Sequence, residues 1–366
     1  DLLEQAIKLE TRTFDLQNIV EKISGVTETE PIENKIVKKI NFDNYKFRNV
    51  FLKVLYLGWN YNGLQRQEVT KNTVVEKLIE ALYRTRLITD RNAKINLCGR
   101  TDKGVSAFGQ AVSLSLRSNL FDPIGVIPES GMNAVRPDVE KEEIDYAFVL
   151  NRSLPDDIRV IGWAEVPIDA HARYSCNARS YNYYMPRADL DLINLIEASE
   201  KLVGIHDFRN FCSYQVQNGV VNHVRLINKV VFYKSNHEIL NPHEKIPPNE
   251  LIVFHIEAKA FLYHQIRSII TILLLVGKGY EKPEIIDEML DMDKFPSKPQ
   301  YAISADFPLL FYDCIFDSVT WKLSESLFIA PPYASMEVLR HIQNVENEYE
   351  IKSKICQTVS KSLKGW

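Results

Sequence analysis

One aspartate, set between two cations and two glycines, is the feature of the sequence most suggestive of chemistry. Asp102 lies in the run GRTDKG at residues 99–104, directly after a short apolar stretch that ends at Leu97. Glycines permit a sharp turn that would hold the side chain outward, and Arg100 and Lys103 favour the ionised carboxylate. Such a carboxylate can act as a nucleophile or a base; the alternative is a surface turn with a local ion pair.

Two glycines at this spacing also occur in phosphate-binding loops, but the sequence excludes that function here. Val105 stands where such a loop needs its lysine.

Cations alternate with aromatic side chains in the run HARYSCNARSYNYY at residues 171–184, and no acidic residue occurs between Asp169 and Asp189. In a strand that faces nucleic acid, Arg173 and Arg179 could contact phosphates while Tyr181 stacks on an exposed base. The alternative is a strand of half-buried tyrosines and solvated arginines.

An arginine also occurs in the apolar run FLYHQIRS at residues 261–268, which begins a strongly apolar segment. Arg267 would be costly to bury in a helix unless a carboxylate faced it. The sequence therefore predicts a carboxylate partner for Arg267, or else an arginine that snorkels to solvent at the start of the helix.

The bulk composition is that of an ordinary globular protein, with 366 residues, 45% hydrophobic residues and a net charge of −4. A negative total lowers the expectation of a nucleic-acid partner but does not exclude a locally basic surface. Five cysteines without a C-x-x-C pair favour a reducing compartment and neither a disulfide framework nor a zinc site. The longest apolar run, residues 269–276, is too short to span a bilayer.

The elements that would position these residues follow from periodicity. Alternating apolar residues predict strands, and apolar stripes after a capping residue predict helices. The expected strands cover residues 50–56, 112–116, 158–164, 224–233 and 251–259; the expected helices follow Thr73 and Asp191 and cover 261–276.

These elements divide the chain into four parts. Residues 1–45 are interpreted as a peripheral helix and linker, 46–165 and 166–320 as two similar sheet-and-helix halves, and 321–366 as a tail. Repetition of strands and a long helix predicts a mixed α/β (α+β) body with a pseudo-twofold relation and a cleft between its halves.

The run CGRTDKGVSAFGQ at residues 98–110 resembles the active-site motif of TruA-type tRNA pseudouridine synthases, and within them the eukaryotic branch that modifies nucleotides 38 and 39 of tRNA. Four further segments match this family in the right order, so that the resemblance covers roughly residues 46–318. They are GWNYNG at 58–63, HARYSCNARSYNYY at 171–184, GIHDFRNF at 204–211 and FLYHQIRS at 261–268.

The resemblance implies a continuous, mostly antiparallel sheet with a central positively charged cleft, and isomerisation of uridine in the tRNA anticodon stem–loop without cofactor or metal. It assigns Asp102 as the nucleophile, Tyr181 as the active-site tyrosine and Arg267 as the arginine that holds Asp102. The residues expected to bind substrate are Arg100, Lys103, Arg173, Arg179, Arg209 and His264.

The same resemblance implies tRNA as partner, a homodimer, no membrane, and a location in nucleus and cytoplasm. The alternatives are a non-catalytic tRNA-binding or folding protein of this fold, and a synthase that acts at other tRNA positions. A hydrolase built on His206 or Asp207 is a more distant alternative, since the sequence offers no nucleophile, base and orienting group around them.

Overall fold

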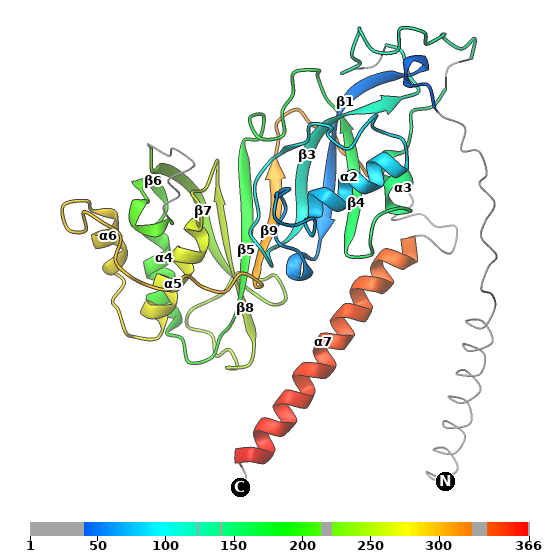
Figure 1. Cartoon of the computed structure of the whole chain (residues 1–366). Helices are drawn as coiled ribbons and strands as arrows, with labels where there is room; N and C mark the ends of the chain where they lie inside the picture. Colours follow the sequence, from blue (N-terminus) through cyan, green and yellow to red (C-terminus); the bar gives the residue numbers. More distant parts are fainter. Residues whose placement is uncertain (1–39, 123, 140, 214–221, 324–334, 365–366) are drawn as a thin grey trace, which may run out of the picture. The chain divides into compact units, whose positions relative to one another are not determined.

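The computed structural model describes residues 40–364, apart from residues 123, 140, 214–221 and 324–334 (Figure 1). The chain divides into two units, Asp1–Asn41 and Phe42–Trp366, and every element given below belongs to the second. The helix and linker expected at residues 1–45 lie almost wholly outside the described residues.

A ten-stranded sheet forms the body, in the order β10-β4-β1-β3-β9-β5-β8-β7-β6, with β2 paired to β3. All of its described pairings are antiparallel except that of β3 with β9. The strands are β1 Lys46–Tyr56, β2 Asn96–Leu97, β3 Ser106–Ser118, β4 Ile158–Glu165, β5 Ala178–Pro186, β6 Gly204–Asp207, β7 Val224–Lys234, β8 Leu251–Ala258, β9 Leu309–Ile315 and β10 Lys322–Leu323.

Six α-helices accompany the sheet in the described part of the chain (Figure 1). They are α2 Val74–Arg84, α3 Tyr146–Asn151, α4 Leu192–Glu200, α5 Gln265–Gly277, α6 Ile285–Leu290 and α7 Ser335–Lys364. The predicted mixed α/β class with a large, mostly antiparallel sheet is therefore confirmed. α3, α6 and α7 are not expected from the sequence, and α5 begins four residues later than expected.

Local sequence explains where two of the helices begin. The side-chain oxygen of Thr73 accepts a hydrogen bond from the backbone N–H of Glu76, as an N-cap should. In a capping box, a glutamate at this position would accept a hydrogen bond from the backbone N–H of the N-cap residue. Here the Glu76 carboxylate instead accepts a hydrogen bond of 2.6 Å from Arg66 Nε. Asp191 caps α4 through the backbone N–H groups of Ile193 and Asn194.

β9 lies between β3 and β5 and joins the two parts of the sheet. Phe311 of β9 is the register partner of Ala107 in β3 and also of Tyr181 in β5. The start of β3 and the middle of β5 therefore meet across a single fully buried ring. This arrangement sets the distance between two stretches that the sequence separates by about 80 residues.

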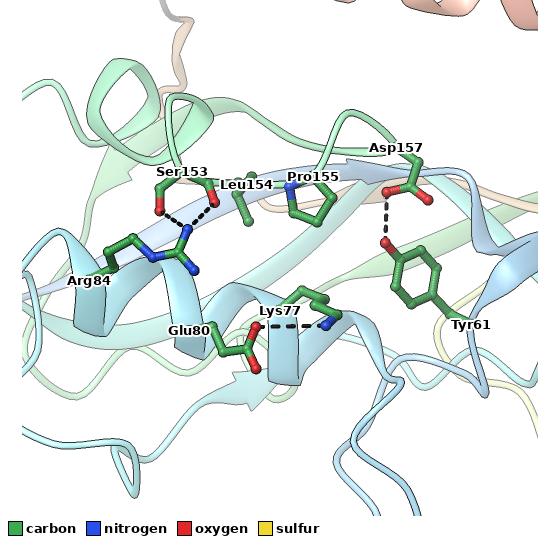
Figure 2. Close-up of a pocket in the computed structure, with 8 residues that line it drawn as sticks. All are labelled: Tyr61, Lys77, Glu80, Arg84, Ser153, Leu154, Pro155 and Asp157. Carbon is green, nitrogen blue, oxygen red and sulfur yellow. Dashed lines mark hydrogen bonds and ion pairs between the residues drawn. The ribbon is translucent and has the colours of Figure 1, made fainter. Parts of the chain in front are cut away.

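A pocket lies between α2 and the turn that precedes β4 (Figure 2). The Tyr61 hydroxyl donates a hydrogen bond of 2.6 Å to Asp157 there, and Arg84 Nη1 donates to the Ser153 hydroxyl at 3.3 Å. Its lining contains none of the residues that the sequence marks for chemistry.

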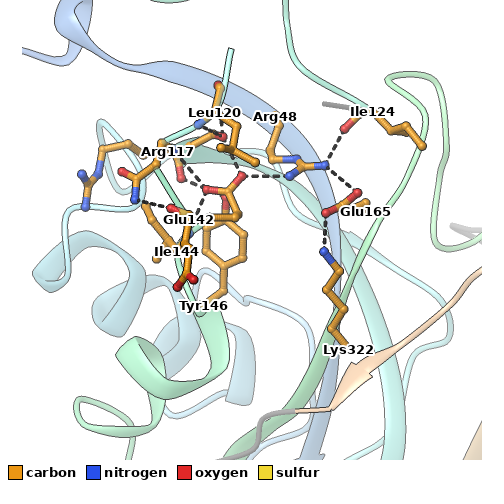
Figure 3. A network of polar contacts seen from close by, with 12 residues as sticks. Arg48, Arg117, Leu120, Ile124, Glu142, Ile144, Tyr146, Glu165 and Lys322 are labelled. Atoms are coloured by element: carbon orange, nitrogen blue, oxygen red, sulfur yellow. Dashed lines mark hydrogen bonds and ion pairs between the residues drawn. The ribbon is translucent and has the colours of Figure 1, made fainter. Parts of the chain in front are cut away.

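A buried arginine fixes the segment between β3 and α3 (Figure 3). Arg48 of β1 is fully buried; its Nη1 lies 2.8 Å from Glu143 Oε2, and its Nη2 donates to the Ile124 carbonyl at 2.7 Å. Glu143 accepts a further hydrogen bond of 2.6 Å from the Ser118 hydroxyl. Because each charge is paired and hydrogen-bonded, the network offsets the cost of burying it.

We expect Glu143→Ala to lower the free energy of unfolding by about 3 kcal/mol or more, because it leaves the Arg48 guanidinium buried without its main counter-ion. Chemical denaturation measures the change. Asp122→Ala is the matched control, since Asp122 pairs with Arg136 where both side chains are more than 60% exposed, and such pairs contribute at most about 1 kcal/mol. Equal effects of the two substitutions would contradict the role given to Arg48.

Candidate active site

Asp102 lies on a tight loop between β2 and β3, as its glycines predict. Gly104 adopts a φ of +79°, which favours glycine, and the Val105 backbone N–H closes the turn on the Asp102 carbonyl at 3.2 Å. Beneath the loop, the Thr101 hydroxyl and the buried Tyr56 hydroxyl share a hydrogen bond of 2.7 Å. The loop is therefore held from the core side while Asp102 stays partly exposed.

A buried glutamine supports the start of the same loop. The Gln110 amide accepts a hydrogen bond from the Gly99 backbone N–H at 3.2 Å and donates one to the Gly99 carbonyl at 3.0 Å. It thus satisfies both polar groups of a residue that has left the strand.

Arg179 connects this loop to two other segments. Its Nε and Nη2 donate to the Cys98 carbonyl at 3.1 and 2.9 Å, Nη2 also donates to the Arg173 carbonyl at 2.6 Å, and Nη1 donates to the Lys259 carbonyl. The residue is only 8% exposed. Its expected part in substrate binding stays a prediction, and this position favours holding the backbone over contacting phosphate.

Two side chains from the start of α5 converge on one oxygen of Asp102. His264 Nε2 lies 3.3 Å and Arg267 Nη1 lies 3.6 Å from Asp102 Oδ2. The carboxylate partner predicted for Arg267 is therefore Asp102. Arg100 and Lys103, which the sequence places beside Asp102, are exposed, and within the described residues neither forms an ion pair with it.

Arg267 reaches Asp102 because a second segment fixes its direction. Arg267 Nε donates to the Ser304 carbonyl at 2.7 Å, and the Ser304 hydroxyl donates back to the Arg267 carbonyl at 2.9 Å. The arginine side chain is 12% exposed, so the guanidinium is largely removed from water, whereas the Asp102 side chain remains 28% exposed.

Tyr181 stands beside this pair on β5, with 7% of its surface exposed. The rings of Phe261 and Phe311 pack edge-on against it at centroid distances of 5.2 and 4.9 Å. Burial, followed by the negative charge of neighbouring groups, raises the pKa of the Tyr181 hydroxyl far above its ordinary value. At neutral pH Tyr181 therefore holds its proton.

The remaining predicted residues lie at the surface. Arg173 is exposed, and its guanidinium lies 5.8 Å from the ring centroid of Tyr174, which is 75% exposed. Arg209 is also exposed, but it pairs with Asp207 through Nε at 3.1 Å to each carboxylate oxygen. Asp207 would compete with a phosphate for Arg209.

Sequence reasoning missed several residues that build the site. Ser304, Gln110, Tyr56 and Phe311 position the loop and Arg267, yet none belongs to a pattern that predicts such contacts. Within the described residues no three His, Cys, Asp or Glu side chains are grouped to hold a metal ion, and no helix there has the length and hydropathy to cross a membrane.

Comparison with known proteins identifies relatives of the whole described body. Residues 198–317 match a family model described as tRNA pseudouridine synthase. A human protein named tRNA pseudouridine(38/39) synthase is 39% identical over 98% of this chain and 75% of its own length. The mouse protein of that name is 44% identical over 87% of this chain and 66% of its own length. The Saccharomyces cerevisiae protein is 34% identical over 97% and 76%.

We call the hydrogen bonds from Arg179 to the carbonyls of Cys98, Arg173 and Lys259 the Arg179 clamp. The clamp should slow local opening of the loop at residues 99–104. Arg179→Lys retains the charge but cannot reach three carbonyl groups at once, so we expect amide hydrogen exchange in that loop to accelerate about tenfold or more. Arg173→Lys is the matched control, because that side chain is exposed and outside the clamp. Unchanged exchange in Arg179→Lys would show that the loop does not depend on the clamp.

Proposed function

Because this chain belongs to the tRNA pseudouridine synthase family, we propose that it isomerises uridine to pseudouridine at positions 38 and 39 of tRNA, with Asp102 as the nucleophile. The observation that carries the proposal is the convergence of His264 and Arg267 on Asp102 Oδ2. When His264 and Arg267 hold Oδ2, the other carboxylate oxygen, Oδ1, can face the substrate. The printed names of the human and mouse relatives support the choice of positions.

The reaction moves one bond and changes no oxidation state. The bond from N1 of the base to C1′ of the ribose breaks, the base turns, and C5 bonds to C1′ in its place. C5 releases its proton, N1 takes up a proton, and any bond made to Asp102 is broken again. Attack of Asp102 on the base and attack on the sugar are both compatible with this balance. In either case the enzyme must hold the detached base in the site until it is rejoined.

Arg267 and Tyr181 have separate parts in this proposal. Arg267 stabilises the ionised Asp102 and fixes its direction, since the guanidinium is itself fixed by Ser304. Tyr181, with its proton in place, would stack on the extruded base or exchange a proton with it. Its raised pKa favours the neutral hydroxyl as the resting form.

Substrate binding follows from groups at the surface around the loop. The target nucleotide must leave the stack of its stem–loop, at a cost of roughly a few kcal/mol. Arg100 and Lys103 flank Asp102 and are suited to phosphates beside the target. The exposed Arg173 and Tyr174 combine a cation with a stacking surface. We further propose that Arg209 and a positively charged cleft between two pseudo-twofold halves continue this surface.

Assembly and location are extensions of the proposal that rest on the family resemblance alone. A homodimer would offer each tRNA a second basic surface, and its mass is measurable by light scattering. A nuclear and cytoplasmic location would match the two compartments through which tRNA passes.

Release of tritium from tRNA labelled at C5 of uridine tests the function, and a non-catalytic tRNA-binding protein would release none. We expect Asp102→Asn to lower release to about 1% of wild type or less, because a nucleophile has no partial substitute. Affinity for tRNA should stay nearly unchanged. Asp157→Asn is the control, since Asp157 accepts a hydrogen bond from Tyr61 and takes no part in the contacts of His264 and Arg267 with Asp102. Substantial turnover by Asp102→Asn would overturn the assignment of Asp102.

Mapping of pseudouridine in tRNA from cells that lack the protein tests the positions. We expect loss at nucleotides 38 and 39, restored by the wild-type chain and not by Asp102→Asn. Loss at another position, with 38 and 39 intact, would refute the assignment of positions while leaving the chemistry in place.

A further inference from the structure

His264 forms a bridge between Asp102 and a serine that no sequence motif marks. Its Nε2 lies 3.3 Å from Asp102 Oδ2, and its Nδ1 lies 2.9 Å from Ser213 Oγ. The Ser213 backbone N–H donates to the Tyr263 carbonyl at 2.9 Å. Tyr263, the residue before His264, therefore holds Ser213 beside the imidazole. The side chains of Asp102, His264 and Ser213 form one continuous row of polar contacts.

The backbone of His264 is strained in a way that points to its side chain. His264 adopts φ 59° and ψ 11°, the left-handed region, directly before α5, and its side chain makes no hydrogen bond that caps the helix. A residue other than glycine or asparagine in this region costs about 1–3 kcal/mol. Glycine would adopt this conformation without strain. We therefore attribute the presence of histidine to the contacts that its imidazole makes with Asp102 and Ser213. Its ring also stacks on Tyr263, at a centroid distance of 3.6 Å and an angle of 28°.

Asp102 and Ser213 together determine which form of the imidazole fits between them. A neutral imidazole has one N–H donor and one acceptor nitrogen. When Ser213 donates its hydroxyl proton to Nδ1, the ring proton lies on Nε2 and is directed at Asp102. The opposite tautomer would place a lone pair against the carboxylate. Because a carboxylate only accepts whereas a hydroxyl can donate or accept, Asp102 favours the proton on Nε2, and Ser213 complements that tautomer by donating to Nδ1.

Both donors that approach Asp102 meet the same oxygen. His264 and Arg267 lie against Oδ2, and among the described residues no side chain bonds to Oδ1. Contacts from two directions, at 3.3 and 3.6 Å, restrain Oδ2 and therefore the plane of the carboxylate more than the Arg267 contact alone would.

We propose that His264 is a positioning residue that bonds Ser213 through Nδ1 and contacts Asp102 through Nε2, and so holds Asp102 by Oδ2 with Oδ1 facing the target nucleoside. The inference rests on the proposed function, because it takes Asp102 as the nucleophile. A serine hydrolase would use the same three residue types with Ser213 as nucleophile. The 28% exposure of the Asp102 side chain, on a glycine turn, favours the first arrangement.

His264→Gly removes the imidazole and leaves the backbone conformation in place, because glycine adopts this φ without strain and the fold should be retained. We expect the single-turnover rate of tritium release to fall about 10- to 100-fold, with affinity for tRNA within about twofold of wild type. Added imidazole should restore several-fold of the lost rate. His237→Gly is the matched control: His237 has a φ of 67° in an exposed turn, and its loss should change neither the rate nor the response to imidazole.

Nitrogen-15 NMR of the His264 ring tests the tautomer without any reaction. We expect the proton on Nε2 in the wild-type chain and in Ser213→Ala, and a mixture of tautomers in Asp102→Ala, which lacks the carboxylate. The rate of Ser213→Ala should fall less than that of His264→Gly. A proton on Nδ1 in the wild type would overturn the proposal whether or not the protein acts on uridine.

Three further results would also overturn it. They are a full rate in His264→Gly, a loss of rate that imidazole does not restore, and covalent labelling of Ser213 by a fluorophosphonate. Absence of tritium release from the wild type would instead refute the proposed function, and the NMR result would then decide whether Ser213 and His264 still orient Asp102.

Discussion

The contact between Asp102 and the start of α5 is the constraint on which the rest of the site depends. The carboxylate comes from the loop before β3, and Arg267 comes from the helix after β8, so that neither segment can form the contact alone. At 28% exposure of Asp102, water weakens the attraction. A weak attraction cannot hold two segments together, and the sheet must bring them there first. The insertion of β9 between β3 and β5 does this.

Buried polar groups make a glycine-rich surface loop rigid enough to carry a reactive carboxylate. Gln110 satisfies both backbone groups of Gly99, and Arg179 donates twice to the carbonyl of Cys98. The loop therefore enters and leaves its turn with its backbone hydrogen bonds made to the protein rather than to water. Such support allows the carboxylate to be oriented before substrate arrives, which is the condition for electrostatic catalysis.

Sequence predicted the parts of this structure that depend on neighbours in the chain. Alternation in β8 and the capping threonine of α2 are local signals, and both were confirmed. The cost of burying Arg267 predicted a carboxylate partner, which Asp102 provides. The contacts of Arg179, Arg48 and Ser213 join residues 50 to 95 positions apart. Such contacts depend on strand register and loop paths, so no spacing in the sequence could predict them. The late start of α5 has the same origin, since the left-handed His264 is held by Ser213 and Asp102.

The packing around Gly99 limits the direction from which a base can reach the site. A side chain added at Gly99 would place its first carbon 2.9 Å from the Phe311 ring and 3.6 Å from the Tyr181 hydroxyl. The glycine is thus required by its close approach to the Phe311 ring, and the Tyr181 hydroxyl is in van der Waals reach on the same side. Phe261 and Phe311 pack against Tyr181 in T-shaped geometry, and only 7% of its surface remains exposed to a substrate. A base in contact with Tyr181 must therefore enter beside Asp102, where the carboxylate is the most exposed of the three proposed catalytic groups. The same packing that keeps Tyr181 protonated would thereby direct the target toward the proposed nucleophile.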